Sequence, residues 1–386
     1  MSVRLGVSAF VACVIATATG IVAASPQTGR SGTAPAAPAA QAPPATPKPW
    51  PPDAKTIAAR RAEAENRALF RSRDTLPVTI TADFKAITRD RNPESTRTFP
   101  GTISYTDEKG ATVSHQIRLR NRGHSRRDVT RCDFPPIRLE FEKAAIVGTV
   151  WEGHGGLKLG THCREVNEYE QYVLREHTVY RIHNLITPES FRTRLAKVTY
   201  IDPATKKVSK PRYGLFIEDD DDVAERMDGR IIDDTDITWA MIEPDSSTWL
   251  GLFEYMIGNT DMSVVAQHNV RSVETAAGKK RVVPYDFDYS GLVDTTYSVP
   301  FAGLNLVSVR DRLFRGPCRT PEELAPYFAK LKELKPQIYA LYDDLPDMSA
   351  SYRKNARGYL DEFYKMVDRP AEVKKNIIDG CKKLGM

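Results

Sequence analysis

The apolar pattern from Trp249 to Ile257 predicts a buried helix in the second half of the chain. The polar run Asp245-Ser246-Ser247 can cap the start of this helix, and Gly258-Asn259 ends it. A buried helix of this kind would hold the segment that follows it on a fixed scaffold. The apolar residues that recur at helical spacing are Trp249, Leu250, Phe253, Met256 and Ile257.

A polar loop and a β-hairpin are predicted after this helix. The loop carries Asp261, His268 and Asn269. Two β-like runs, 270–274 and 281–285, then lead into Asp286-Phe287-Asp288. Phosphoryl transfer needs an Asp near the acceptor hydroxyl and hard oxygen ligands for magnesium, and this segment supplies both. Asp and Asn are also common turn residues, because their side chains cap nearby backbone groups, so a purely structural role stays open.

The first half of the chain is rich in runs that alternate apolar and polar residues, which is typical of β-strands. Asp107-Glu108-Lys109-Gly110 is a hairpin turn between two of these runs. The early strands are predicted at 78–82, 98–105, 113–120 and 136–141, and a later hairpin at 196–202 and 213–218. Helical periodicity is found at 166–185, 323–342 and 351–366.

A β-rich first half and a mainly helical second half predict an α+β protein with two lobes around a cleft. The first lobe would span residues 75–217, and the second lobe, with the polar loop, residues 218–386.

The N-terminus has the pattern of an export signal. A single early charge, Arg4, precedes an apolar run, and Val22-Ala23-Ala24 is suited to cleavage by signal peptidase, which predicts a signal peptide over 1–24. An uncleaved membrane anchor is the competing reading. Residues 25–74 then form a Pro- and Ala-rich disordered spacer followed by a charged lead-in helix at 55–73. We therefore expect a secreted, periplasmic or cell-surface protein with no stable membrane span once the signal is cleaved.

The composition is that of a globular protein, with 41% hydrophobic residues and a formal net charge of +5. So mild a positive charge does not argue for binding to nucleic acid, and export argues against it.

Four cysteines remain once the predicted signal is removed, namely Cys132, Cys163, Cys318 and Cys381. In an oxidising compartment this even number predicts two disulfides, for which three connectivities exist. We favour a pairing of Cys132 with Cys163. A zinc site is disfavoured because the spacings include no short Cys-x-x-Cys.

The ten residues from Arg118 to Arg127 include five arginines around Gly123. Backbone N–H groups and guanidinium forks of this kind can surround a phosphate, so we favour an anion site. An exposed basic loop at a sheet edge is the alternative.

Glu176 falls on the apolar stripe of the helix at 166–185, so its carboxylate needs a cation. It would either pair locally with Arg175 or Arg181 or orient a phosphate-binding Lys or Arg. The run Asp219–Asp222 lacks the alternating spacing of a calcium loop, and we expect it to be a solvated helix start.

Taken together, these segments resemble the CotH kinase family, the spore-coat-protein-H-like branch of the protein-kinase-like fold. The resemblance rests on five segments that follow the family's order between about Ile117 and Val293. They are Arg120–Ser125, Phe134–Leu139, Tyr213–Glu218, Gly258–Asp261 with Asn269, and Val283–Asp288.

The resemblance implies a two-lobed protein-kinase-like fold and a set of site residues. Asp261 would be the catalytic residue, and Asn269, Asp286 and Asp288 would hold magnesium. The nucleotide phosphates would be held by Arg122, by Arg138 at the position of the family's Lys, or by Lys158, with Glu176 positioning one of these residues. This chain departs from the family at Arg138 and in the eight-residue spacing between Asp261 and Asn269.

The function that follows is that of an exported atypical kinase, which transfers the γ-phosphate of ATP to a Ser or Thr hydroxyl of another exported or cell-surface protein. The expected cofactor is Mg²⁺, with Mn²⁺ as a substitute. The alternative is a non-catalytic pseudokinase that acts as an exported binding or cell-surface protein.

Overall fold

The structure is a computed structural model that describes residues 49–233 and 236–381. The predicted signal peptide and most of the predicted spacer lie outside the described residues. The described residues from Pro49 onward cluster into one unit. The predicted lead-in helix is present as two pieces, α1 (Ala54–Glu65) and α2 (Ala68–Arg71), and Asp53 caps the first by accepting the N–H of Thr56.

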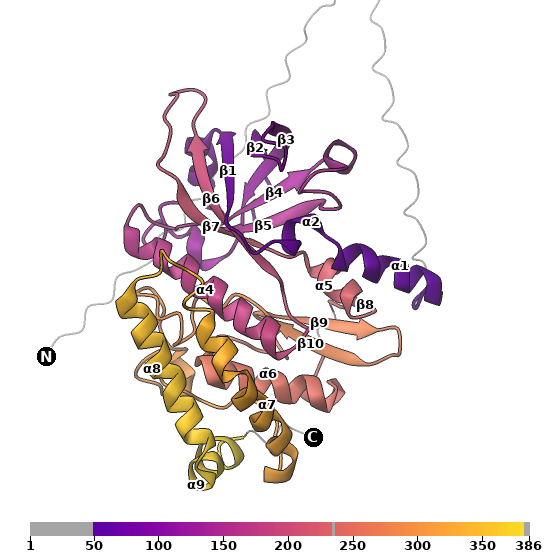
Figure 1. The fold of residues 1–386 in the computed structure, drawn as a ribbon, viewed down its shortest axis with the longest axis vertical. Helices are drawn as coiled ribbons and strands as arrows, with labels where there is room; N and C mark the ends of the chain where they lie inside the picture. The colour runs from indigo at the N-terminus through magenta and orange to yellow at the C-terminus, as the bar shows by residue number, and fades with distance from the viewer. Residues whose placement is uncertain (1–48, 234–235, 382–386) are drawn as a thin grey trace, which may run out of the picture. The chain divides into compact units, whose positions relative to one another are not determined.

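Seven strands close into a barrel in the order β1-β2-β3-β4-β5-β7-β6 (Figure 1). Neighbouring strands are antiparallel except β1 and β6, which pair in parallel and close the barrel. Closure leaves none of the seven with a free edge, where unpaired backbone groups would invite aggregation. The strands are β1 (Leu76–Ala82), β2 (Phe99–Thr106), β3 (Thr112–Asn121), β4 (Ile137–Phe141), β5 (Gly156–Gly160), β6 (Thr193–Ile201) and β7 (Arg212–Ile217).

The predicted two-lobed, protein-kinase-like fold is wrong, because the strands of the first half form a closed barrel and not a lobe beside a cleft. The coarser α+β prediction agrees with the structure. The error has a physical cause: alternation of apolar and polar residues specifies a strand and its buried face, but not the strand beside it. The pairing of β1 with β6, which joins Leu76 to Ala196, is not encoded in either strand's own pattern.

The barrel interior is filled by apolar side chains around Trp151, which comes from the loop between β4 and β5 and is fully buried. Its indole ring packs against the rings of Tyr105, Phe141 and Phe216 at centroid distances of 5.8, 5.5 and 5.3 Å. Side chains that are also completely buried in this core include Ile80, Ile103, Leu119, Leu139, Leu157 and Leu159. A loop residue therefore contributes the largest side chain of the barrel core.

The second half adds helices and a small antiparallel sheet with the strand order β10-β9-β8. Its strands are β8 (Gly229–Ile231), β9 (Val270–Thr275) and β10 (Lys280–Pro284), and the longer helices are α4 (Asn167–Ile186), α6 (Pro244–Ile257), α7 (Pro321–Ala340) and α8 (Ala350–Val367). The short helices are α3 (Phe84–Arg89), α5 (Asp220–Arg226) and α9 (Pro370–Val373). Helix α4 packs against β6 and β7 and against α7, so it joins the barrel to the helices (Figure 1).

Most local predictions are confirmed within one to three residues. The predicted helices at 166–185, 323–342 and 351–366 are α4, α7 and α8, and all three predicted hairpins are present, as β2-β3, β6-β7 and β9-β10. Thr320 starts α7 with a capping box to Glu323. The sequence interpretation missed β5 and β8, since Gly156–Gly160 is buried on both faces and β8 has only three residues.

The run Asp219–Asp222 does start a helix, but it is not a solvated one. Asp219 accepts the N–H of Asp221 as the cap of α5. Asp222 is buried and bonds the guanidinium of Arg67 at 2.7–3.0 Å. Asp220 pairs with two cations near the candidate site. The carboxylates of Asp219, Asp220 and Asp222 therefore pair with cations from separate parts of the chain, whereas Asp221 is exposed.

Two disulfides are formed, Cys132–Cys163 and Cys318–Cys381, which confirms the predicted first pairing. Their Cα atoms lie 4.8 and 5.0 Å apart. Disulfides of this kind persist in oxidising compartments, which agrees with the expected export. Among the helices that the structure describes, none combines the length and apolarity needed to cross a bilayer.

Peptide mapping of the native protein without reductant is expected to recover both linked pairs and no alkylated cysteine. The bridges close segments with sequence separations of 31 and 63 residues, and each is expected to stabilise the fold by about 3–4 kcal/mol by restricting the unfolded chain. Reduction should therefore lower the melting temperature. Alkylation of all four cysteines in the native protein would contradict the pairing.

Candidate functional site

The candidate site begins where α6 ends. Gly258 adopts a left-handed conformation, with φ of 67°, and terminates the helix. The next residue, Asn259, bonds back to the carbonyl of Glu254 at 2.8 Å. Further along the chain, Gly291 and Leu292 donate to the carbonyls of Gly258 and Ile257 at 3.0 and 2.9 Å. These backbone bonds bring the loop after α6 and the segment after β10 to the same place.

The loop after α6 holds Asp261 and Asn269 in direct contact, although eight residues separate them. Nδ2 of Asn269 donates to the carbonyl oxygen of Asp261 at 2.7 Å and to its Oδ2 at 3.1 Å. Nε2 of His268 lies 3.2 Å from Oδ1 of Asp261, a contact that raises the pKa of His268. Paired backbone bonds between Ser263 and His268 close the loop. The residues between Asp261 and Asn269 therefore form a side loop, and the side chains of Asp261 and Asn269 stay in contact.

Asp286 and Asp288 lie on either side of a buried aromatic anchor. Phe287 is fully buried between Tyr180 and Phe253, at centroid distances of 4.7 and 5.4 Å. Asp286 has a φ of 63°, and its N–H donates to the hydroxyl of Tyr180 at 2.9 Å. A left-handed conformation at a residue other than glycine is uncommon and is often associated with functional sites.

The two carboxylates differ in exposure. The Asp286 side chain is 31% exposed, whereas that of Asp288 is 7% exposed. Oδ2 of Asp288 accepts a hydrogen bond from the Tyr297 hydroxyl at 3.0 Å. Burial raises the pKa of Asp288, and the nearby Arg126 opposes that change. Asp286 is therefore the carboxylate that a ligand reaches, and Asp288 lies beneath it.

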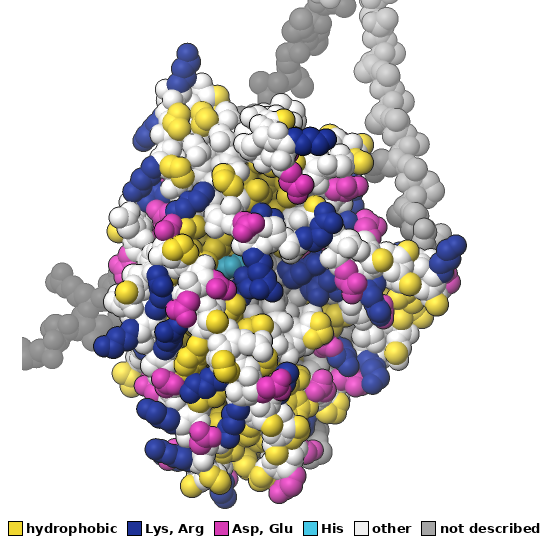
Figure 2. All heavy atoms as spheres, viewed as in Figure 1, with side chains coloured by type: hydrophobic (Ala, Val, Ile, Leu, Met, Phe, Trp, Pro, Cys, Tyr) yellow, Lys and Arg dark blue, Asp and Glu magenta, His cyan; other side chains and the backbone are white. Residues whose placement is uncertain are grey.

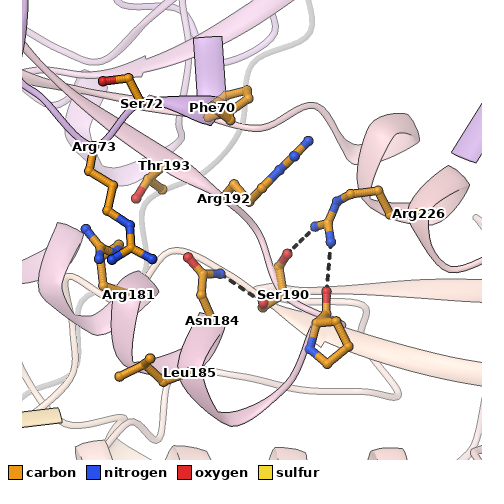
Figure 3. Close-up of a pocket in the computed structure, with 11 residues that line it drawn as sticks. Phe70, Ser72, Arg73, Arg181, Asn184, Leu185, Ser190, Arg192, Thr193 and Arg226 are labelled. Atoms are coloured by element: carbon orange, nitrogen blue, oxygen red, sulfur yellow. Dashed lines mark hydrogen bonds between the residues drawn. The ribbon is translucent and has the colours of Figure 1, made fainter. Parts of the chain in front are cut away.

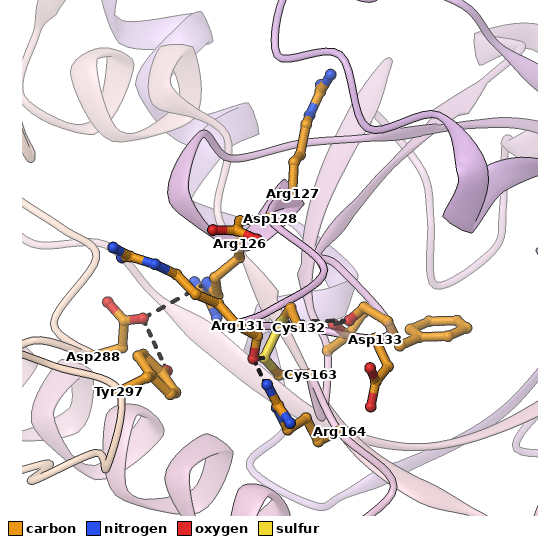
Figure 4. Close-up of a disulfide and its surroundings, with 12 residues drawn as sticks. Arg126, Arg127, Asp128, Arg131, Cys132, Asp133, Cys163, Arg164, Asp288 and Tyr297 are labelled. Atoms are coloured by element: carbon orange, nitrogen blue, oxygen red, sulfur yellow. Dashed lines mark hydrogen bonds and ion pairs between the residues drawn. A yellow bond between two sulfur atoms is a disulfide. The ribbon is translucent and has the colours of Figure 1, made fainter.

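Arg126 connects both carboxylates to the five-arginine segment. Its guanidinium lies 3.3 Å from Asp286 and 3.6 Å from Asp288, and its side chain is 11% exposed. Figure 4 shows it reaching Asp288 from the loop that the Cys132–Cys163 disulfide anchors. Sequence reasoning missed Arg126 and chose Arg122, because nothing in a basic run shows which side chain points inward.

Glu176 is buried on α4 near these groups, and its Oε1 has no hydrogen-bond partner among the described residues. Burial, reinforced by the charge of Asp288, raises the pKa of Glu176, while Arg126 and Arg122 lower it. The local ion pair with Arg175 or Arg181 is not formed in the described structure. Arg175 instead donates to the carbonyls of Val293 and Asp294.

The predicted phosphate-binding residues are divided between two places. Lys158 on β5 bonds Asp220, which also accepts from Nε of Arg271 at 2.8 Å. The positive charge of Arg122 adds to burial in lowering the pKa of Lys158, and it also lowers the pKa of Glu176. Arg138, opposite Lys158 across the strand pair, contacts Asp219 at 3.6 Å. Among the described residues, Arg122 acts on the charge of Glu176, and Nζ of Lys158 lies 5.2 Å from the ring centroid of Tyr285, the residue before Asp286.

The donor set fits a magnesium ion that is completed by phosphate oxygens and water. In the described ranges, no cluster of three or more His, Cys, Asp or Glu is arranged to enclose a metal. Magnesium, however, is commonly held by one or two carboxylates together with substrate phosphates. Asp286 offers a partly exposed carboxylate. Asn269 uses its Nδ2 on Asp261, so its Oδ1 stays available as a ligand.

Comparison with known proteins found no matching family model, no matching curated protein and no matching solved structure. The resemblance to the CotH family therefore stays a prediction, and the functional argument depends on the site's own residues.

Proposed function

We propose that this protein is a magnesium-dependent phosphotransferase, which transfers the γ-phosphoryl group of ATP to a Ser or Thr hydroxyl of another protein outside the cytoplasm. The observation that carries the proposal is the arrangement of Asp261, Asn269 and Asp286. Two loops that are hydrogen-bonded to the end of α6 present these side chains together. The proposal does not depend on a kinase-like fold, because an active site is defined by its groups and not by the fold that carries them.

Each residue has a distinct role in this proposal. Asp261 accepts the proton of the acceptor hydroxyl while that oxygen takes the phosphoryl group and ADP leaves. Asn269 and Asp286 would hold Mg²⁺, or Mn²⁺ in its place, with Asp288 below as a further carboxylate. Bound magnesium neutralises phosphate charge and orients the transferred group. Lys158 and Arg122 attract the phosphates, and Glu176 would position one of these residues.

A non-catalytic pseudokinase is the second candidate, and Arg126 favours it. The guanidinium already neutralises Asp286 and Asp288, the groups that would otherwise attract a metal. In a catalytic protein, magnesium must compete with this guanidinium for Asp286. In a binding protein, the same contact would hold the basic loop in place.

Thermal unfolding of the purified protein with ATP and Mg²⁺ tests the proposal. A ligand that binds only the native state, at a concentration 100-fold above its Kd, adds about 2.7 kcal/mol to the free energy of unfolding. The melting temperature should therefore rise. ATP with EDTA and Mg²⁺ alone are the controls and should give smaller increases. Labelled ATP incubated with neighbouring secreted proteins then measures transfer.

The outcomes separate the candidates. Magnesium-dependent binding with transfer supports the phosphotransferase, and binding without transfer supports the pseudokinase. If ATP with Mg²⁺ does not raise the melting temperature, neither candidate uses this site to bind nucleotide.

A further inference from the structure

A second site lies away from the loops described above, in a cavity of about 260 Å³. The segment before β1, the last turns of α4 and the start of β6 form its walls (Figure 3). Four arginines line this cavity, Arg73, Arg181, Arg192 and Arg226, and none of the eleven lining residues is acidic. Figure 2, which has the same view as Figure 1, shows Lys and Arg side chains gathered in the middle of the molecule, between the places of α2 and α4.

Two of the four arginines are already paired and form part of the wall. Arg192 and Arg226 both bond Glu218, which is completely buried, at distances of 2.5–3.0 Å. Arg226 also donates to the carbonyl of Pro188 at 2.8 Å. These contacts satisfy both guanidinium groups and fix the shape of the cavity.

The other two arginines have no carboxylate within ion-pair distance in the described structure. Arg73 is exposed and Arg181 is half-buried, and both line the same side of the cavity (Figure 3). Burial and the charge of Arg73 both lower the pKa of Arg181, and the charge of Asp344 only partly opposes them. Two like charges that act on each other in this way repel unless an anion lies between them.

The remaining polar groups of the cavity are largely committed to the protein. Nδ2 of Asn184 donates to Ser190 and to the carbonyl of Phe191, both at 2.9 Å. Oγ1 of Thr193 lies 2.8 Å from Nδ1 of His177. The guanidinium forks of Arg73 and Arg181 are therefore the main donors left for a ligand, and such forks match the oxygens of a tetrahedral anion.

We infer that this cavity is a binding site for a phosphate or sulfate monoester, with the oxyanion held between Arg73 and Arg181. A water molecule occupies about 30 Å³, so the volume of the cavity is several times that of one water molecule. The cavity therefore has room for the anion and for part of the organic group of the monoester. Phe70 and Leu185 give that organic part an apolar wall. The site does not depend on the proposed phosphotransferase activity, because it shares no residue with that site.

Phenyl phosphate is the probe that tests the inference, by calorimetric titration and by thermal unfolding. It should bind wild-type protein more tightly than inorganic phosphate does, because its ring contacts the apolar wall, while phenol should not bind. Arg73→Gln and Arg181→Gln should each weaken phenyl phosphate binding about 10- to 100-fold, and the double variant should abolish it.

Arg230→Gln is the matched control, because Arg230 is exposed and pairs with Glu274 away from the cavity. It removes the same charge and should leave binding unchanged. Without ligand, Arg73→Gln should melt no lower than wild type, since it relieves repulsion with Arg181. If Arg73→Gln without ligand melts at a lower temperature than wild type, Arg73 has a merely structural role. That result would overturn the inference.

Inorganic phosphate and sulfate separate a built site from a general salt effect. If both anions stabilise wild type and the double variant equally, or if phenyl phosphate fails to bind wild type at millimolar concentration, the inference is wrong. Preferential binding of the monoester that requires Arg73 and Arg181 supports it.

Discussion

Asp286→Asn is expected to abolish magnesium-dependent nucleotide binding and to lower phosphoryl transfer by about a thousandfold or more. The substitution keeps the size of the side chain and removes the charge of the more exposed carboxylate of the pair, 31% exposed against 7% for Asp288. Magnesium then loses its main protein ligand while Arg126 still contributes a positive charge. The measurements are the melting temperature with Mg²⁺ and ATP, and transfer from labelled ATP.

Asp294→Asn is a matched control for this substitution. Asp294 also has a left-handed backbone, with φ of 55°, and pairs with Arg310 at 3.0 Å. It is not among the residues proposed to touch nucleotide or metal, so its variant should keep binding. Full activity of Asp286→Asn would remove the phosphotransferase proposal.

Asp288→Asn should have a different effect, because Asp288 is the better-held of the two carboxylates. The sequence by itself suggests the reverse, since Ser290-Gly291 begins only two residues after Asp288. In the structure, Tyr297 and Arg126 hold it, and its variant should lose stability as well as affinity. Removing one partner of a buried charge pair leaves the other uncompensated.

Asp261→Asn is expected to lower transfer by about 10²- to 10⁴-fold and to spare nucleotide binding. Asp261 serves the acceptor hydroxyl in our proposal, whereas the metal is held by Asn269 and Asp286. The measurement compares the Kd for ATP with Mg²⁺ against the rate of transfer. A loss in rate without a loss in affinity is the expected result.

His268→Gln is the companion variant, because His268 contacts Oδ1 of Asp261 and is exposed. It should keep most activity, since Asn269 still holds the Asp261 carboxylate. If Asp261→Asn loses nucleotide affinity as severely as Asp286→Asn does, Asp261 acts by positioning Asn269, and its assignment as the catalytic base is wrong.

The sequence alone determined the helices and hairpins that depend on residues only a few positions apart. The helix at α6, the polar loop and the hairpin that leads to Asp286 follow from apolar periodicity and from turn residues a few positions apart. The export context and even cysteine count predicted two bridges, and Cys132–Cys163 was the favoured pair. The candidate site was found because its groups lie at the ends of such local elements.

Only the tertiary structure decided features that depend on partners distant in sequence. The barrel is closed by the pairing of β1 with β6. Each strand alternates apolar and polar residues, but neither sequence specifies which strand pairs with it. The pairing of Arg126 with Asp286, and the shared cavity of Arg73 and Arg181, join segments that no period or motif relates. Long-range pairing and the direction of each side chain are set by the packing of the whole chain, so residue type alone could not reveal which arginine enters the site.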